Sequence, residues 1–364
     1  MPGVPPRVAS GLMPTTEIPV VSLAAVESEE ALANTLTDIF HRIGFVVVVD
    51  HGVPAALLDE VFSSMERFFS LSDEQKRSID KLDSPWFRGW EAVGNEYTNN
   101  RRDEREQIDL WSEWPTRPLD IEPHYLRLLG PNQWPPDDIH PGLEALMRDW
   151  YVAMGGLADQ LLSLIAVGLG LAADHFTWML GSEPMSLTKL IHYPPTPVGA
   201  AGVNAHHDAG FLTVLDAGPT PGLEVAFPDQ GWVKVPSIEG GLVINLGENL
   251  QAMTGNYLVA TPHRVVTADE RFSAGYFHGS SLDVSLAPLE LDPRFAAAVE
   301  ASDYHRSAGF MARKEETEAG TEEMASERPA ATYGEQLWNY FSRSYPDNMA
   351  RHHPDVTPTE QRHD

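Results

Sequence analysis

The chain has 364 residues, a formal net charge of −28 and no cysteine. The acidic charge argues against nucleic acid or an anionic membrane as a partner, because those surfaces attract clustered Lys and Arg. The absence of cysteine excludes disulfides and thiolate metal ligands, and it fits a reducing cytoplasm. No apolar run reaches the ~18 residues that a membrane-spanning helix needs. We therefore expect a cytoplasmic protein, with a monomer as its simplest state.

The first part of the chain predicts alternating strands and helices. Residues 1–16 contain Pro and Gly and are expected to form a flexible lead. Residues 28–43 place their apolar side chains at helical spacing, and residues 55–69 do the same. Between these helices, the β-branched run 45–49 predicts a buried strand. His51 follows this strand at a turn, and we interpret it as a structural residue rather than a metal ligand.

Residues 83–114 are polar and aromatic, which indicates a loop. Two interpretations stay open, an ordinary surface loop and a segment that contacts a substrate. Arg88, Trp90 and Tyr97 are the candidate contacts in the second case. Residues 143–169 predict a long apolar helix that belongs to the core and carries no chemistry.

From residue 186 onward, short apolar segments alternate with Gly and Pro turns, a pattern that is typical of a jelly roll. Residues 222–235 predict a hairpin, and residues 242–246 predict a buried strand. Residues 311–328 are rich in Glu, Ala and Thr and are expected to be mobile. Residues 333–341 predict a helix, and the chain beyond it is polar.

Two histidines and one aspartate form a candidate metal site. His206 and Asp208 share one face at the end of a predicted strand, because residues two apart in a strand point the same way. His263 heads another predicted strand. Two imidazoles and one carboxylate, with the other metal positions open, are the ligands of non-haem Fe(II) oxygenases. Residues 353–355 repeat the His-x-Asp pattern, but we interpret them as part of a solvated terminus.

The ligand set also points to a co-substrate. Fe(II) with one Asp and two neutral His keeps a single positive charge, which a dianionic 2-oxo acid can chelate. The far carboxylate of that acid would lie inside the barrel, where an unpaired charge is very costly. The guanidinium of Arg271 matches a carboxylate in two-point geometry. Ser273 shares the strand face of Arg271 and adds a hydroxyl donor.

These motifs resemble the isopenicillin N synthase-like branch of the Fe(II)/2-oxoglutarate oxygenases. The resemblance rests on His206-His207-Asp208, on His263-Arg264-Val265 and on Arg271-Phe272-Ser273. It implies Fe(II), 2-oxoglutarate and O2 as cofactors. It also implies oxidation of a C–H bond of a small molecule, such as an amino acid or a specialised-metabolite intermediate, with release of succinate and CO2.

The resemblance implies an α+β fold, in which helices flank a double-stranded β-helix (jelly-roll) core. An N-terminal α/β module precedes this core, and a C-terminal helix caps it. The expected division is 1–16 as the flexible lead, 17–114 as the N-terminal dioxygenase module and 115–180 as a connection with the backbone helix. Residues 181–300 form the catalytic core, and 301–364 comprise the mobile segment, the C-terminal helix and the tail.

The same resemblance assigns Tyr193 to the distal carboxylate of 2-oxoglutarate. The family often has Asn two residues before this Tyr and Cys three residues after it, whereas this chain has Ile191 and Thr196. The segment 83–114 corresponds to the part that closes over the active-site mouth in the family. Further candidate substrate contacts are Lys189, Phe211 and Phe277.

Several rival functions stay open. An oxidase like isopenicillin N synthase uses no 2-oxo acid and keeps Arg-x-Ser for a substrate carboxylate. The run from Arg271 to His278 is also similar to the ethylene-forming group, which fragments 2-oxoglutarate. From a different class, the chain could be a non-catalytic jelly-roll binding protein. A zinc hydrolase is disfavoured, because the usual zinc ligand spacings are missing.

Overall fold

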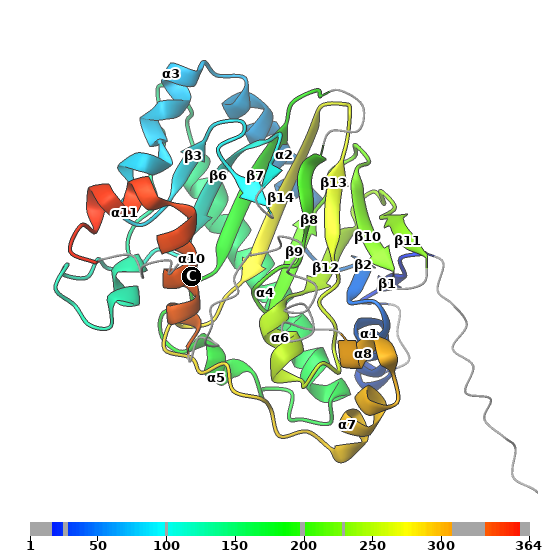
Figure 1. The fold of residues 1–364 in the computed structure, drawn as a ribbon. Helices are drawn as coiled ribbons and strands as arrows, with labels where there is room; N and C mark the ends of the chain where they lie inside the picture. The colour runs from blue at the N-terminus through cyan, green and yellow to red at the C-terminus, as the bar shows by residue number, and fades with distance from the viewer. Residues whose placement is uncertain are drawn as a thin grey trace, which may run out of the picture.

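The structure is a computed structural model that describes residues 17–24, 28–98, 101–196, 201–227, 230–307 and 332–356. Its described part contains two facing β-sheets of eight and four strands and a two-stranded hairpin (Figure 1). The large sheet has the order β1 (Val20–Ser22), β2 (Phe45–Val49), β12 (Leu242–Leu246), β9 (Leu212–Asp216), β14 (Arg271–His278), β7 (Leu187–Tyr193), β6 (Glu106–Trp111) and β3 (Gly89–Glu91).

The small sheet has the order β11 (Gly231–Lys234), β10 (Leu223–Phe227), β13 (His263–Val266) and β8 (Ala201–His206). The hairpin consists of β4 (Tyr97–Thr98) and β5 (Arg101–Arg102). The two larger sheets form the predicted jelly-roll core. The predicted lead at 1–16 and the segment 311–328 lie outside the described residues.

Helices flank this core. They are α1 (Glu29–Arg42), α2 (Ala55–Phe69), α3 (Asp73–Lys76), α4 (Leu143–Gly168), α5 (Thr177–Leu180), α6 (Glu248–Met253), α7 (Pro293–Glu300), α8 (Asp303–Ser307), α10 (Tyr333–Ser344) and α11 (Pro346–His352). Helices α1 and α2 contact α4, and α4 contacts β9 and β14. Helices α10 and α11 lie on the side of the molecule where β3, β6 and β7 are found, away from β10 and β11 (Figure 1).

The first helices follow local rules that the sequence displays. Ser28 caps α1 by accepting a hydrogen bond from the amide of Ala31. Ser72 and Gln75 form the capping box at the start of α3. The buried strand 45–49 and the apolar faces of α1, α2 and α4 agree with the predictions, because burial of one apolar face decides each of them.

Within the described residues, α4 is the one helix that is long and apolar enough, by length and composition, to cross a membrane. By length and composition, α4 therefore does not meet the expectation that no segment could span a membrane. Half of its most apolar window is buried inside the protein, where the helix contacts the large sheet. A core helix meets the same criterion of length and composition.

The N-terminal strands extend the same sheet as the core strands. Strands β1 and β2 continue it beyond β12, and β6 and β3 continue it beyond β7. The predicted units 17–114 and 181–300 are thus joined by strand pairing.

The large sheet has one face toward α4 and an opposite face that we call the inner face. Tyr276 packs against Tyr151 of α4, and Thr188 accepts a hydrogen bond from Trp150 of α4, so these strand residues face outward. Because side chains alternate along a strand, Phe277 and its neighbours at every second position point inward. The inner face is the side on which the candidate metal ligands lie.

Two predictions about loops were wrong. The segment 83–114 contains β6, whose six residues are all buried, and the charge of its inward residue Asp109 is paired with Lys81 and Lys189. The tail is not simply solvated either. His353 is buried with its Nε2 beside the carbonyl of Pro85, and Asp355 accepts two hydrogen bonds from Arg127.

Candidate metal centre

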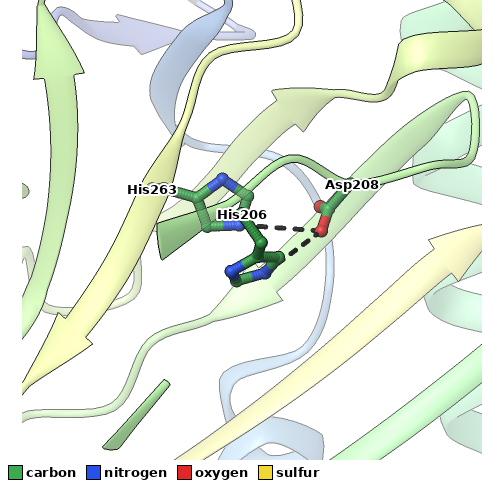
Figure 2. A group of neighbouring side chains, drawn as sticks. All are labelled: His206, Asp208 and His263. Carbon is green, nitrogen blue, oxygen red and sulfur yellow. Dashed lines mark ion pairs between the residues drawn. The ribbon is translucent and has the colours of Figure 1, made fainter. Parts of the chain in front are cut away.

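Strand pairing brings the two predicted histidines together. His206 ends β8 and His263 begins β13, and the two residues are directly paired across the small sheet. Asp208 follows in the loop after β8. Its Oδ1 lies 3.7 Å from Nε2 of His206 and 3.6 Å from Nε2 of His263 (Figure 2). Among the described residues, this is the one group whose ligand atoms converge in the manner of a metal site.

Backbone carbonyls orient both imidazoles. Nδ1 of His206 lies 2.9 Å from the carbonyl oxygen of Asn204, and Nδ1 of His263 lies 3.1 Å from that of Thr261. A proton on each Nδ1 donates to the carbonyl and leaves the Nε2 lone pair for a metal. Burial, together with the neighbouring His263, lowers the pKa of His206 to about 3, so this imidazole is neutral at physiological pH.

The carboxylate is oriented by two hydrogen bonds. Thr213 of β9 and Asn245 of β12 each donate to Oδ2 of Asp208 at 2.6 Å, which leaves Oδ1 toward the imidazoles. Burial alone would raise the pKa of Asp208, but the two imidazoles and these donors outweigh it and lower the pKa below its usual value. The carboxyl group of Asp208 is therefore deprotonated, as a carboxylate ligand of a metal must be.

The start of α6 holds the loop that carries Asp208. The amide of Glu248 donates to the carbonyl of Asp208 at 2.8 Å, and the amide of Asn249 donates to that of Gly210 at 3.1 Å. Gly247 is required here, because a Cβ at this position would collide with the backbone of Gly210.

The donor set fits a divalent transition metal. Metal–ligand bonds of ~2.1 Å at right angles place neighbouring ligand atoms about 3 Å apart. The separations of 3.6 and 3.7 Å need only a small contraction to reach this value. Two nitrogens and one oxygen with open positions suit non-haem Fe(II).

A second polar site lies beside Arg271, the first residue of β14. Arg271 is 1% exposed and is paired with Tyr193 in the β7–β14 ladder. Its Nε and Nη2 donate to the carbonyls of Thr220 and Ala217 at 3.2 and 2.9 Å. Its Nη1 is buried and has no hydrogen-bond partner in the described part of the chain.

Tyr193 and Ser273 complete the surroundings of this guanidinium. The guanidinium carbon lies 4.9 Å from the centroid of the Tyr193 ring, and the hydroxyls of Ser273 and Tyr193 are 3.5 Å apart. Gly202 makes room for the Tyr193 ring, which a Cβ would strike. A buried cation with a free donor and two adjacent hydroxyls fits a carboxylate, because an unsatisfied buried group is costly.

Two of the predicted substrate contacts are not brought to the metal centre. Arg88 is fully buried and donates to the carbonyls of Gly130, Ser112 and Leu128, so it fixes the loop 128–130. Trp90 lies on the outward face of β3 and donates its indole N–H to Glu106 at 2.8 Å. We correct both to structural residues, because their polar atoms face other parts of the protein.

The other four candidates have mixed positions. Tyr97 is 59% exposed on the β4–β5 hairpin, and β4 contacts β8, the strand that ends at His206. Lys189 and Phe277 lie on the inner face of the large sheet, and Phe277 is paired with Thr213, a partner of Asp208. Phe211 is buried in the loop after Asp208 and contacts Tyr333 of α10. All four stay predictions.

Comparison with known proteins identifies the family. A model of the non-haem dioxygenase N-terminal region, named for morphine synthesis, matches residues 18–137, and a model of the 2OG-Fe(II) oxygenase superfamily matches residues 184–280. The 2-oxoglutarate-dependent dioxygenase frbJ of Dothideomycetidae sp. is 30% identical over 352 residues, which cover 93% of this chain and 90% of frbJ. The chain belongs to the 2OG-Fe(II) oxygenase superfamily.

Other members of this oxygenase superfamily are similar as well. The proline hydroxylase buaE of Petromyces alliaceus is 30% identical over 278 residues, covering 72% of this chain and 85% of buaE. A full-length Neurospora crassa protein, whose crystal structure contains alpha-KG and 5-formyluracil, aligns with a TM-score of 0.67 at 20% identity. This alignment covers 89% of our chain and 96% of the Neurospora chain, and it supports the fold.

This oxygenase is a 2-oxoglutarate-dependent dioxygenase that oxidises C–H bonds of a small molecule, and its cofactors are Fe(II), 2-oxoglutarate and O2. When bound, iron and 2-oxoglutarate together supply oxidation by O2, with succinate and CO2 as the products of the co-substrate.

Several residues that support the centre were not predicted from the sequence. Thr213, Asn245 and Asn204 orient the ligands, yet they are distributed over three strands. Asn245 offers the one usable signal, since an amide inside an apolar run 242–246 is unusual in a buried strand.

Proposed function

We propose that His206, Asp208 and His263 hold the iron of this oxygenase, and that Arg271, Ser273 and Tyr193 hold the distal carboxylate of 2-oxoglutarate. The observation that carries this assignment is the unpaired, buried Nη1 of Arg271 beside a converged set of three ligands. We place the chain in the isopenicillin N synthase-like branch, on the order and spacing of these motifs.

The residues of the chain then have separate tasks. Thr213 and Asn245 hold Asp208, and two backbone carbonyls hold the imidazoles, so the ligands need little rearrangement on metal binding. The buried guanidinium of Arg271 orients the co-substrate and compensates its charge. Helix α10 packs over the loop of Phe211 through Tyr333 and helps to exclude water from the oxidation.

The two rival reactions differ from this one in how they use 2-oxoglutarate. An isopenicillin N synthase-like oxidase would place a substrate carboxylate at Arg271, and an ethylene-forming enzyme would fragment 2-oxoglutarate. The names of the relatives favour ordinary 2-oxoglutarate-dependent oxidation. A small substrate is expected, and an amino acid or a specialised-metabolite intermediate is our choice.

The test begins with anaerobic titration of the Fe(II) protein with 2-oxoglutarate. A visible charge-transfer band is expected, because co-substrate chelation to Fe(II) produces one. Admission of O2 with candidate substrates should then yield succinate in proportion to oxidised product. Lack of the band refutes 2-oxoglutarate binding, and ethylene in the headspace would instead identify the fragmenting reaction.

A further inference from the structure

Strand β6 and the residue before it carry an unusual set of side chains on the inner face. From residue 105 to residue 111, every second residue is at most 7% exposed. Each of these residues has a buried polar atom without a hydrogen-bond partner in the described part of the chain. These atoms are Nε of Arg105, Oε1 of Gln107, Oδ1 of Asp109 and Nε1 of Trp111. Folded proteins leave few buried polar atoms unsatisfied, so four in one row indicate a missing partner.

The strand register places this row near the metal centre. Asn245 and Thr213, which hold Asp208, are paired across neighbouring strands. The same line of cross-strand pairs continues over the inner face through Phe277 and Leu187 to Trp111. Asp109 and Lys189 are paired in the next row. Neighbouring strands are ~4.8 Å apart, and residues two apart in one strand are ~7 Å apart. Lys189 is two strands and one such step from Thr213, which places them about 12 Å apart along the sheet. A small molecule bound above the sheet can span this distance.

Charged groups surround the unpaired atoms. Nζ of Lys81 lies 2.6 Å from Glu91 and 2.8 Å from Asp109, and Nζ of Lys189 lies 3.2 Å from Asp109 and 3.5 Å from Glu96. Lys189 therefore has two acceptors for three N–H groups.

The charges in this cluster nearly balance. Arg105 lies 3.1 Å from Asp103 and 3.7 Å from Glu96, so three cations face four carboxylates. Burial and the neighbouring Glu96 raise the pKa of Glu91 to about 7, which brings the balance closer to neutral. A ligand with a net charge would therefore disturb a balanced, buried set of charges.

Hydrogen bonds connect this cluster to the metal ligands. Asp103 accepts from the amide and side chain of Asn204 at 3.1 and 2.8 Å, and the carbonyl of Asn204 holds Nδ1 of His206. At the other end, Tyr345 binds both Lys81 and Glu96 at 3.1 Å, next to α10. The ring of Phe341 in α10 lies 5.7 Å from that of Trp111. The row is thus enclosed between the metal centre and the C-terminal helices.

The chemistry of the unpaired atoms identifies the class of ligand. Gln107 and Asp109 offer acceptors, whereas Arg105, Lys189 and Trp111 offer donors. An apolar ligand would leave both kinds unsatisfied, and a simple anion would leave the acceptors without a partner. A zwitterion satisfies both kinds and adds no net charge.

We propose that the inner face of β6, with Lys189 of β7, binds the oxidised substrate, and that this substrate is a free amino acid or a close analogue. Its ammonium group donates to Asp109 and Gln107, and its carboxylate accepts from Lys189 and Arg105. The inference rests on the proposed function, because it supplies the substrate class for the same site.

The experiment uses the full chain loaded with Fe(II) and 2-oxoglutarate without O2. Thermal scans are recorded with each standard protein amino acid, and then with the N-acetyl and amide derivatives of any that stabilise the protein. At least one amino acid should raise Tm and, with O2, stimulate succinate formation, whereas its capped derivatives should not. The charge-transfer band in the same samples reports the proposed function separately.

Three variants locate the binding. Gln107→Leu and Asp109→Asn should weaken binding of the stabilising amino acid by roughly tenfold or more and leave the charge-transfer band unchanged. Gln107→Leu removes the unsatisfied oxygen together with one hydrogen bond, from Nε2 to Glu96 at 3.2 Å, and Tm of this variant without amino acid reports its effect on folding. Glu106→Gln, on the outward face of the same strand, is the matched control and should lower Tm without changing amino-acid binding.

The proposal is overturned if no free amino acid stabilises the protein, if the capped derivatives bind equally well, or if Gln107→Leu binds like the parent chain. Any of these results would mean that ordered water, and not an amino acid, binds the unpaired polar atoms on the inner face of β6. Absence of the band in the parent chain refutes the proposed function instead, and the thermal scans would still decide the question of amino-acid binding.

Discussion

His206 and His263 face each other in the pairing of β8 and β13, and each Nδ1 lies beside a backbone carbonyl two residues earlier in the chain. This shared arrangement fixes both rings in the tautomer that leaves Nε2 free. Both imidazoles can therefore offer Nε2 to a metal, although their sequence neighbourhoods differ. The predictions below test this centre and the site beside it.

Removal of one imidazole should abolish metal-dependent turnover. His206→Ala is expected to lower Fe(II) affinity by roughly 100-fold or more. Even the loss of a residue that only hydrogen-bonds to a metal ligand lowers metal affinity by about 10-fold to 100-fold. Fe(II) titration and succinate formation measure the effect, and circular dichroism checks the fold. His353→Ala, in the second His-x-Asp, is the control and should lower Tm while metal affinity stays unchanged. Undiminished turnover in His206→Ala would refute the centre.

The two donors to Asp208 should tune the metal without touching it. Thr213→Val and Asn245→Ala each remove one hydrogen bond to Oδ2, which frees the carboxylate to rotate. We expect each variant to lose about 10-fold to 100-fold in Fe(II) affinity. The KM for 2-oxoglutarate, measured at saturating iron, should change little. An unchanged metal affinity in both variants would contradict the orienting role.

Two buried arginines provide a matched pair of variants. Arg271→Lys should raise the KM for 2-oxoglutarate by roughly 10-fold to 100-fold, because a Lys ammonium cannot reproduce the planar fork. Arg88→Lys should lower Tm and leave this KM unchanged, since Arg88 binds only backbone carbonyls among its described partners. The reverse pattern would place the co-substrate at Arg88.

Asp216 should make stability depend on pH. Burial raises its pKa to about 6, although the Gly218 amide and the charge of Arg271 oppose the rise. The folded state therefore holds this proton more tightly than the unfolded chain, where Asp titrates near ~4. The resulting stability is present below about pH 4 and is lost as the pH rises through about 6.

The variant Asp216→Asn removes this titration. It should raise the free energy of unfolding at neutral pH by up to about 3 kcal/mol, which corresponds to two pKa units. Urea unfolding at several pH values measures the change. The same pH slope in the variant and the parent chain would assign the dependence to other groups.

The prediction of local structure succeeded where one apolar face decides the element. The helix that Ser28 caps and the strand 45–49 are of this kind. It failed for β6, because Gln107 and Asp109 on its inner face read as loop residues in a linear sequence. Asp109 pairs with Lys81 and Lys189, and Gln107 donates to Glu96, so the partners of both come from other segments. The tail failed for a similar reason, since Arg127 holds Asp355 from far along the chain.

The amino-acid sequence by itself pointed to the family and its cofactors, because His-x-Asp, a distant His and Arg-x-Ser predict the ligands and the co-substrate by residue type and order. Only the tertiary structure decided which other polar residues join them. Arg88 and Trp90 looked like substrate contacts but turn their polar atoms to backbone and to Glu106, whereas Gln107 and Asp109 turn theirs to the inner face. The reason is physical: a side chain's partner depends on strand register and facing, and both are set by pairing between residues far apart in the chain.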